Sequence, residues 1–239
     1  MFFSIKKLTP AEKTICYKTI SPMAIFAIIG DAILNHTSVS VVRMGDGERK
    51  ILEADSDKPF TYFENSHRDW NKRLGIVDIP INALKKSILE AGNNCTYFAP
   101  SVSGISMPRY YLYNFFKPRP YYFDNFYVNN WTFTMIKMLL EASDSVFIIH
   151  RDYKKIINNF KKNYNLTGKS QLKFDGFPKN NWDDNEQAID AAIKSGRQLV
   201  LYSGGPGGKI IGPEIAKTKN KIVLDVGNTL IPWSTKKAD

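Results

Sequence analysis

Four short apolar runs, each followed by a loop and then by a helical pattern, constrain the fold of this chain more than any other feature. They are SVSVV (38–42), SVFII (145–149), QLVLY (198–202) and NKIVLDV (220–226). Short runs rich in Val, Ile and Leu that alternate with helices are typical of buried parallel strands. The sequence therefore predicts an α/β fold: a mostly parallel, Rossmann-like sheet with helices on both faces.

Helical periodicity fills the intervals between these runs. Ser21 and Pro22 suit the first turn of a helix over about 20–35, since serine caps helices and proline fits their first turn. An amphipathic helix within 78–92 has one apolar face made of Ile81, Leu84, Ile88 and Leu89. Further helices are expected at about 48–54, 129–142, 153–163 and 185–196 and after the glycine loop at 203–209, and short strands at 95–100 and 172–178.

No linker, internal repeat or low-complexity segment divides the 239 residues, so we expect a single domain over 1–239. Its core is expected at about 20–232, followed by a fraying tail at 233–239. The apolar run 21–34 is too short to cross a bilayer and has no small-residue cleavage site after it. Two cysteines without a partner spacing indicate neither a disulfide framework nor a zinc site, which favours a cytoplasmic location.

The formal net charge of +10 favours anionic partners such as phosphorylated sugars or an acidic membrane face. Its densest patches are KPRP, HRDYKK and FKKNYN. A merely basic surface is the alternative explanation. Because no DNA- or RNA-binding signature accompanies the charge, we expect no nucleic acid partner. The basic charge also leads us to expect peripheral contact with the inner face of the membrane.

The loop RMGDGE (43–48) follows the first predicted strand, at the end of a parallel strand where ligands gather. Asp46 and Glu48 are separated by one glycine. Hard divalent cations take carboxylate oxygens and keep open positions for phosphate oxygens, so these acids suit a metal that holds a diphosphate. The alternative is an exposed, solvated turn in which Asp46 caps the next helix.

Two further loops follow predicted strands. SGGPGGK (203–209) has four glycines, whose free N–H groups suit an anion, but it matches neither the P-loop nor the dinucleotide spacing; a glycine-rich connection without a ligand is the alternative. DVGNTL (225–230) resembles the start of haloacid-dehalogenase phosphatases. Their second aspartate is missing and too little chain follows, so we reject that function.

The order RMGDGE, GGPGGK, LDVGN resembles the GT-D type of bacterial glycosyltransferase, a family first catalogued as a domain of unknown function. The resemblance covers about 20–232. The family hallmark R-[FY]-G-D-G-E is matched here with Met44 at the aromatic position, while the loop like L-G-P-T-A and the terminal D-[IL]-G-H correspond to SGGPGG and DVGN. The first motif is fairly specific, and the other two matter mainly through their order.

This resemblance implies a metal-dependent glycosyltransferase that moves a sugar from a UDP-sugar, with Mn²⁺ or Mg²⁺, to a glycan, glycoprotein or lipid-linked saccharide in bacterial cell-surface glycosylation. Its D-x-E acids map to Asp46 and Glu48 as the catalytic residues. Glu48 would contact the metal, and Asp46 would hold the metal shell or the donor ribose. The implied donor-binding residues are Arg43, Gly45, Gly204, Gly205, Pro206, Gly207 and Lys209.

Three positions keep alternatives open. Arg43 is either a structural partner of the acids or a donor-binding cation, and Lys209 either meets phosphate or is a solvated helix lysine. Asn228 replaces the family histidine, which would be a metal or phosphate ligand, and a carboxamide binds a transition metal more weakly than imidazole. The alternative function is therefore a degenerate, non-catalytic module that binds a nucleotide sugar.

No motif identifies the acceptor's general base, for which His150, Asp152 and Asp175 are candidates near predicted strand ends. The aromatic stretch 110–127 offers stacking faces for a sugar or uracil ring, or it packs into the core.

Overall fold

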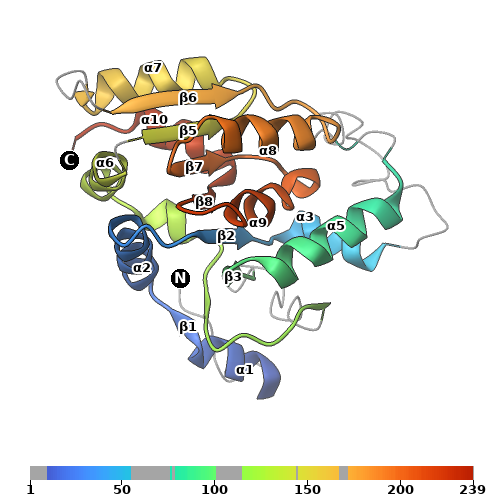
Figure 1. Ribbon diagram of the computed structural model, residues 1–239. Helices are drawn as coiled ribbons and strands as arrows, with labels where there is room; N and C mark the ends of the chain where they lie inside the picture. The colour runs from blue at the N-terminus through green and yellow to red at the C-terminus, as the bar shows by residue number, and fades with distance from the viewer. Residues whose placement is uncertain are drawn as a thin grey trace.

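The computed structural model describes residues 10–54, 76, 79–100, 115–143, 145–166 and 172–238. Within these ranges, six strands form one sheet in which every neighbouring pair is parallel, in the order β3-β2-β8-β7-β5-β6 (Figure 1). The strands are β2 (Val39–Arg43), β3 (Tyr97–Ala99), β5 (Ser145–Ile149), β6 (Lys173–Phe177), β7 (Leu199–Tyr202) and β8 (Ile222–Asp225). The predicted parallel α/β sheet is confirmed.

Both faces of the sheet are buried, as the strand β7 illustrates. Leu199 and Leu201 point into one hydrophobic cluster, and Val200 and Tyr202 point into another. The first cluster is covered by α2 (Pro22–Leu34), α6 (Phe133–Ala142), α7 (Tyr153–Asn163) and α10 (Leu230–Thr235). The second is covered by α8 (Asp184–Lys194) and α9 (Ile211–Ala216), and a third by α3 (Asp46–Glu53) and α5 (Ile81–Asn94). Successive side chains of a strand point to opposite faces, so continuous apolar runs produce this sandwich.

Short elements complete the described chain. They are α1 (Pro10–Tyr17), η3 (Tyr127–Asn130), η5 (Pro206–Gly208), η6 (Gly227–Thr229) and a two-stranded parallel sheet of β1 (Thr19–Ile20) and β4 (Tyr122–Phe123). No helix among the described residues is long and apolar enough to cross a bilayer.

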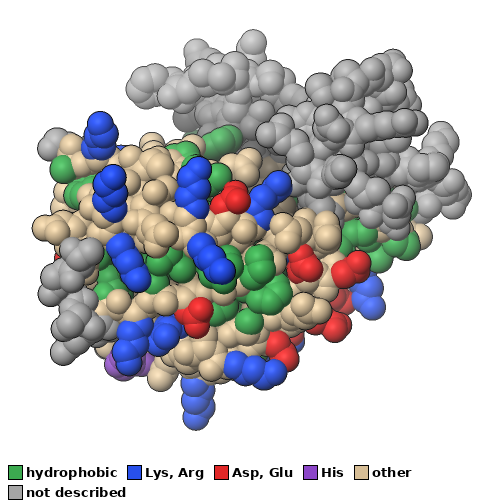
Figure 2. All heavy atoms as spheres, turned by 90° about the horizontal axis from the view of Figure 1, so that it is seen from above, with side chains coloured by type: hydrophobic (Ala, Val, Ile, Leu, Met, Phe, Trp, Pro, Cys, Tyr) green, Lys and Arg blue, Asp and Glu red, His purple; other side chains and the backbone are tan. Residues whose placement is uncertain are grey.

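Basic side chains are spread over the surface. Viewed from above Figure 1, on the side of α7, lysines and arginines are scattered between apolar and acidic side chains (Figure 2). The helix α7 itself exposes Lys154, Lys155, Lys161 and Lys162. The positive charge on this face is therefore distributed over it.

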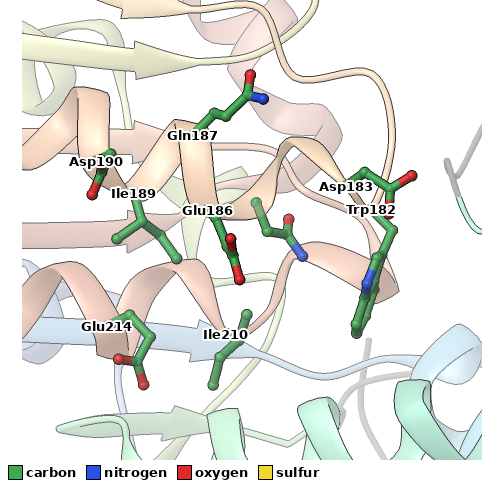
Figure 3. Close-up of a pocket in the computed structure, with 9 residues that line it drawn as sticks. Trp182, Asp183, Glu186, Gln187, Ile189, Asp190, Ile210 and Glu214 are labelled. Carbon is green, nitrogen blue, oxygen red and sulfur yellow. The ribbon is translucent and has the colours of Figure 1, made fainter.

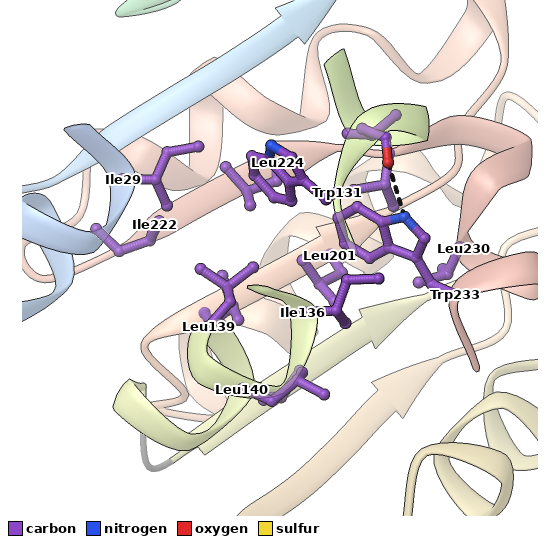
Figure 4. Packing of buried hydrophobic residues seen from close by; sticks show 14 of the residues in the cluster. Ile29, Trp131, Ile136, Leu139, Leu140, Leu201, Ile222, Leu224, Leu230 and Trp233 are labelled. Carbon is purple, nitrogen blue, oxygen red and sulfur yellow. Dashed lines mark hydrogen bonds between the residues drawn. The ribbon is translucent and has the colours of Figure 1, made fainter. Parts of the chain in front are cut away.

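The predicted fraying tail is wrong for its first residues. Trp233 lies in α10 and is only 2% exposed, stacked on Trp131 with ring centroids 5.4 Å apart (Figure 4). Its indole N–H donates to the carbonyl oxygen of Val128 at 3.0 Å, the dashed line in Figure 4. Burial of one large aromatic ring outweighed the polar residues that follow it, which had suggested a tail.

Where it is described, the aromatic stretch lies partly in the core and partly at the surface. Tyr122, Phe123 and Tyr127 are buried, while Tyr121 and Phe126 are partly exposed; the residues 101–114 lie outside the described ranges. The helix predicted at 129–142 is divided, because η3 ends at Asn130 and α6 begins only after Thr132. The Thr132 side chain accepts a hydrogen bond from Met135 N–H and caps α6.

The position of β8 assembles the candidate site. Although last in the chain, β8 lies between β2 and β7. All three strands are parallel, so their carboxyl ends meet at one edge of the sheet, where ligands gather in such folds. The three loops that the sequence analysis singled out are thereby brought together.

Candidate functional site

The first loop turns directly into α3, and this buries Glu48. Gly45 is the N-cap residue, Asp46 is the first helical residue, and the Glu48 carboxylate accepts a hydrogen bond from Gly45 N–H at 2.8 Å. A glutamate at the third helical position commonly caps the helix in this way. Glu48 is only 6% exposed, so the alternative of an exposed, solvated turn is wrong at this residue. The side chain of Asp46 lies outside what the structure describes.

Lys209 joins the glycine loop to the other two loops. Its ammonium nitrogen lies 2.7 Å from Asp225 Oδ2 at the end of β8 and 3.3 Å from Glu48 Oε1. Burial lowers the pKa of Lys209, but the carboxylates of Asp225 and Glu48 outweigh that effect and raise the pKa above its usual value. Lys209 is thus a buried ammonium shared by two acids, and not a solvated helix lysine.

Arg43 is a second cation beside Asp225. Its backbone N–H donates to Asp225 Oδ2 at 3.3 Å, and its Nε lies 3.9 Å from Asp225 Oδ1. The guanidinium donates to the carbonyl oxygen of Asn125 at 2.8 Å. It also lies against Gly227, where an added Cβ would meet the guanidinium, and the φ of +51° there favours glycine. Of the two roles left open for Arg43, this geometry supports the structural one.

We call Arg43, Glu48, Lys209 and Asp225 the charge cluster. Two cations face two anions, and Glu48, Lys209 and Asp225 are each less than a tenth exposed. Burying charges is tolerable only when they are paired and hydrogen-bonded in this way.

The residues described here do not fit a divalent metal held by Glu48. Its Oε2 already accepts the Gly45 N–H, and its Oε1 faces the Lys209 ammonium, which supplies the positive charge that a metal ion would bring. Within the described ranges, no group of three or more His, Cys, Asp or Glu side chains is placed to hold a metal.

A separate pocket lies beside the charge cluster, beyond the ends of β5, β6 and β7, and we call it the basic pocket. Its volume is about 80 Å³, so it holds a group and not a whole nucleotide. The described residues that line it are His150, Arg151, Lys179, Asn180, Ser203, Gly204, Gly205 and Asn228, none of them acidic. It therefore suits an anion.

Two side chains that line the basic pocket have a lowered pKa. Burial lowers the pKa of Lys179 to about 8, with Asp184 acting in the opposite direction, so the ammonium form still prevails at pH 7. Burial also lowers the pKa of His150, which favours the neutral ring. Its Nδ1 accepts a hydrogen bond from Asp152 N–H at 2.9 Å, so the neutral ring carries its proton on Nε2 and is a donor there.

Backbone conformation and close packing require glycine at several positions of the loop 203–209. Gly205 has φ +58° and ψ −165°, a region that is almost exclusive to glycine. A Cβ on Gly204 would lie 2.8 Å from the Cα of Gly208, and a Cβ on Gly207 would lie 3.1 Å from both Ile76 and Trp182. Pro206 is buried at the start of η5. Of the loop residues predicted to bind the donor, only Gly204 and Gly205 line the basic pocket.

The sequence reasoning missed part of this site. It named Asp225 only within the DVGN motif and Arg151 only within the basic patch HRDYKK, and it passed over Lys179, which lies in a loop without any motif. Position directly after the predicted strand 145–150 was a further signal available for Arg151. Of the candidate bases, Asp152 is exposed beside His150, and Asp175 is exposed within β6; neither is among the described residues lining the basic pocket.

No family model matches this sequence, and no curated protein matches it either. Among solved structures, it is similar to one described as "the highly conserved domain of unknown function 1792", which "has a distinct glycosyltransferase fold". The two are 15% identical with a TM-score of 0.50, over 92% of this chain and 88% of that one. At this identity the similarity concerns the fold: the chain has a fold similar to that of a glycosyltransferase.

Proposed function

We propose that the protein is a glycosyltransferase that takes a sugar from a nucleotide-diphosphate donor, a UDP-sugar, and transfers it to a glycan, glycoprotein or lipid-linked saccharide of the bacterial cell surface. The observation that carries the proposal is the basic pocket. In a fold similar to that of a glycosyltransferase, it places two cationic side chains, a histidine and two loop glycines at the carboxyl edge of the parallel sheet. Ligands of such sheets bind at this edge.

The chemistry needs stabilisation of the leaving group. As the bond between the anomeric carbon and the diphosphate oxygen breaks, negative charge develops on the diphosphate. Preorganised donors aimed at developing charge are the largest source of catalysis in such reactions. Here the Arg151 guanidinium, the Lys179 ammonium and the Nε2–H of His150 would take a phosphate of the donor.

The Mn²⁺ or Mg²⁺ expected from the sequence has no part in this proposal. A metal at the D-x-E loop would supply the same positive charge to the diphosphate, but Glu48 is already paired with Lys209. The charge cluster would instead hold the three loops together, since each loop contributes at least one residue of the cluster.

A second candidate is a non-catalytic module that binds a nucleotide sugar. One observation favours it: among the described residues lining the basic pocket, none is a carboxylate able to deprotonate an acceptor hydroxyl. His150 does not fill that role in its neutral form, because its Nδ1 is occupied and its Nε2 bears the proton. The module and the enzyme predict the same donor binding and differ only in turnover.

The test is a panel of nucleotides with EDTA present. UDP and UDP-sugars should raise the melting temperature and uridine should not, since a ligand that binds only the folded state stabilises it. The variant Lys179→Met should show a clearly smaller shift, whereas Lys155→Met, which changes an exposed lysine of α7, should keep the full shift. Release of UDP from a UDP-sugar identifies the enzyme, and binding without release identifies the module. No shift with any nucleotide would contradict both.

A further inference from the structure

A second and larger pocket lies between α8 and α9, on the other side of the glycine loop. Its volume is about 890 Å³, within the range of small-molecule sites. Figure 3 shows Glu186 and Ile189 of α8 directed toward Ile210, which precedes α9, with the Trp182 indole at one end. We call this space the α8–α9 pocket.

The lining of this pocket contrasts with that of the basic pocket. It has four carboxylates, Asp183, Glu186, Asp190 and Glu214, in a chain whose net charge is +10. Two of them are partly neutralised on their own helices, since Asp190 pairs with Lys194 at 3.0 Å and Glu214 with Lys217 at 2.6 Å. The described chain offers Asp183 and Glu186 no partner.

An unsatisfied amide oxygen gives an independent sign of a missing ligand. Asn185 lines the α8–α9 pocket and is 7% exposed. Its Nδ2 donates to the carbonyl oxygen of Gly207 at 2.8 Å, but its buried Oδ1 has no hydrogen-bond partner among the described residues. Buried acceptors are nearly always paired, so this oxygen lacks a donor that the described part of the chain does not supply.

The two pockets are lined by neighbouring stretches of the chain. Gly204 and Gly205 line the basic pocket, whereas Gly207 is bonded to Asn185 and packs against Trp182 of the α8–α9 pocket. Likewise Lys179 and Asn180 line the first pocket and Trp182 and Asp183 the second, with a single residue between the pairs. A ligand in the α8–α9 pocket therefore lies next to a phosphate held in the basic pocket.

We propose that the α8–α9 pocket binds the sugar acceptor, and that this acceptor is a neutral or amine-bearing saccharide. The role of this saccharide as the acceptor rests on the proposed function, whereas its binding in the α8–α9 pocket does not. Carboxylates and a carboxamide oxygen accept hydrogen bonds from hydroxyl or amino groups, and the indole offers an apolar face. An anionic saccharide would be repelled by Asp183 and Glu186. A polycationic peptide fits less well, because lysines already offset two of the four carboxylates and a lysine peptide has no sugar ring to pack on the Trp182 indole.

Binding of short saccharides without any nucleotide tests the proposal separately from the donor. Three probes of equal length are compared by ligand-observed NMR: chitotetraose, which is neutral, its de-N-acetylated form, and tetragalacturonate, which is anionic. Tetralysine is the fourth probe. The first two should bind and the last two should not. Binding of tetragalacturonate or of tetralysine alone, or no binding by any saccharide, would overturn the proposal.

Variants locate the binding. Glu186→Gln keeps the shape of an exposed pocket residue and should weaken saccharide binding about fivefold to tenfold, because a neutral amide oxygen accepts a weaker hydrogen bond than a carboxylate does. The matched control is Glu90→Gln, an exposed glutamate of α5 outside the pocket, which should bind as the wild type does. Equal weakening by both variants, or by neither, would place the saccharide elsewhere. If the wild-type protein binds the saccharide but not UDP, the proposed function is overturned, while saccharide binding in the α8–α9 pocket remains supported.

Discussion

The charge cluster and the basic pocket lie side by side at one edge of the sheet, yet they use charge in opposite ways. In the cluster, Lys209 and Arg43 face Glu48 and Asp225, and the charges cancel inside the protein. In the basic pocket, His150, Arg151 and Lys179 line a space without any carboxylate among its described lining residues. The comparison teaches that a conspicuous charged motif can be structural while the charge available to a ligand lies in loops with no motif.

The largest expected effect breaks the charge cluster. Lys209→Met leaves Glu48 and Asp225 buried without their shared cation, so we expect the free energy of unfolding to fall by about 3–5 kcal/mol. Urea denaturation measures it. The control Lys221→Met removes another buried lysine, whose Nζ donates to the carbonyl oxygens of Ala192 and Arg197, and should cost about 1–3 kcal/mol.

A double variant keeps this prediction testable if Lys209→Met does not fold. Lys209→Met with Glu48→Gln removes one uncompensated charge and should be more stable than Lys209→Met alone, because a neutral amide still accepts the Gly45 N–H. If Glu48→Gln gives no recovery, or if folded Lys209→Met loses less stability than Lys221→Met, the cluster does not hold the loops together.

A smaller effect concerns the backbone of the basic pocket. Gly205→Ala forces a side chain into a region that is almost exclusive to glycine, at an expected cost of about 1–3 kcal/mol of stability and weaker UDP binding. Gly30→Ala is the control, because an added Cβ there meets nothing within 4 Å and alanine favours the helix α2. Thermal denaturation compares the two. Equal stability of both variants would show that the loop relaxes freely around residue 205.

The smallest expected effect is a pH dependence that differs between the basic pocket and the charge cluster. Lys179 has its pKa lowered to about 8, so between pH 7 and 9.5 it loses its proton, and we expect UDP to bind about tenfold more weakly, the loss of one charged contact. Lys209, whose pKa is raised above its usual value, keeps its proton and the cluster stays intact. Calorimetric titration of UDP at several pH values measures this, and Lys179→Met should show no such dependence.

The sign of the accompanying stability change is opposite to that of the binding change. The pKa of Lys179 is lower in the folded state than its ordinary value of 10.5, so the unfolded chain binds more protons between about pH 8 and 10.5. The contribution of Lys179 to stability therefore rises with pH in this window. A UDP affinity that rises with stability over this window would contradict the assignment.

The sequence predicted the architecture because apolar runs and helical periodicity are local signals. The parallel sheet, α5 with its buried Ile81, Leu84 and Ile88, and the glycine loop between β7 and α9 all follow from such patterns. It did not predict that Trp233 packs on Trp131, since that contact joins residues about a hundred positions apart.

The site was predicted less completely, for the same physical reason. The motif loops were located, and the order of the strands brings them together, but pairing of Glu48 with Lys209 depends on three-dimensional neighbours. Lys179 carries no local signal at all: its burial and its place in the basic pocket come from the course of the segment before α8. The metal-binding role expected for Asp46 stays a prediction, because its side chain lies outside the described structure.

The central claim is that protein side chains in the basic pocket, and no metal at the D-x-E loop, hold the donor diphosphate. The most direct measurement is calorimetric titration of UDP into the wild-type protein, once with EDTA and once with Mn²⁺. We predict the same affinity in both solutions and, in both, about tenfold weaker binding by Lys179→Met, since one charged contact is lost. Binding of UDP that requires Mn²⁺ and is unaffected by Lys179→Met would contradict the account.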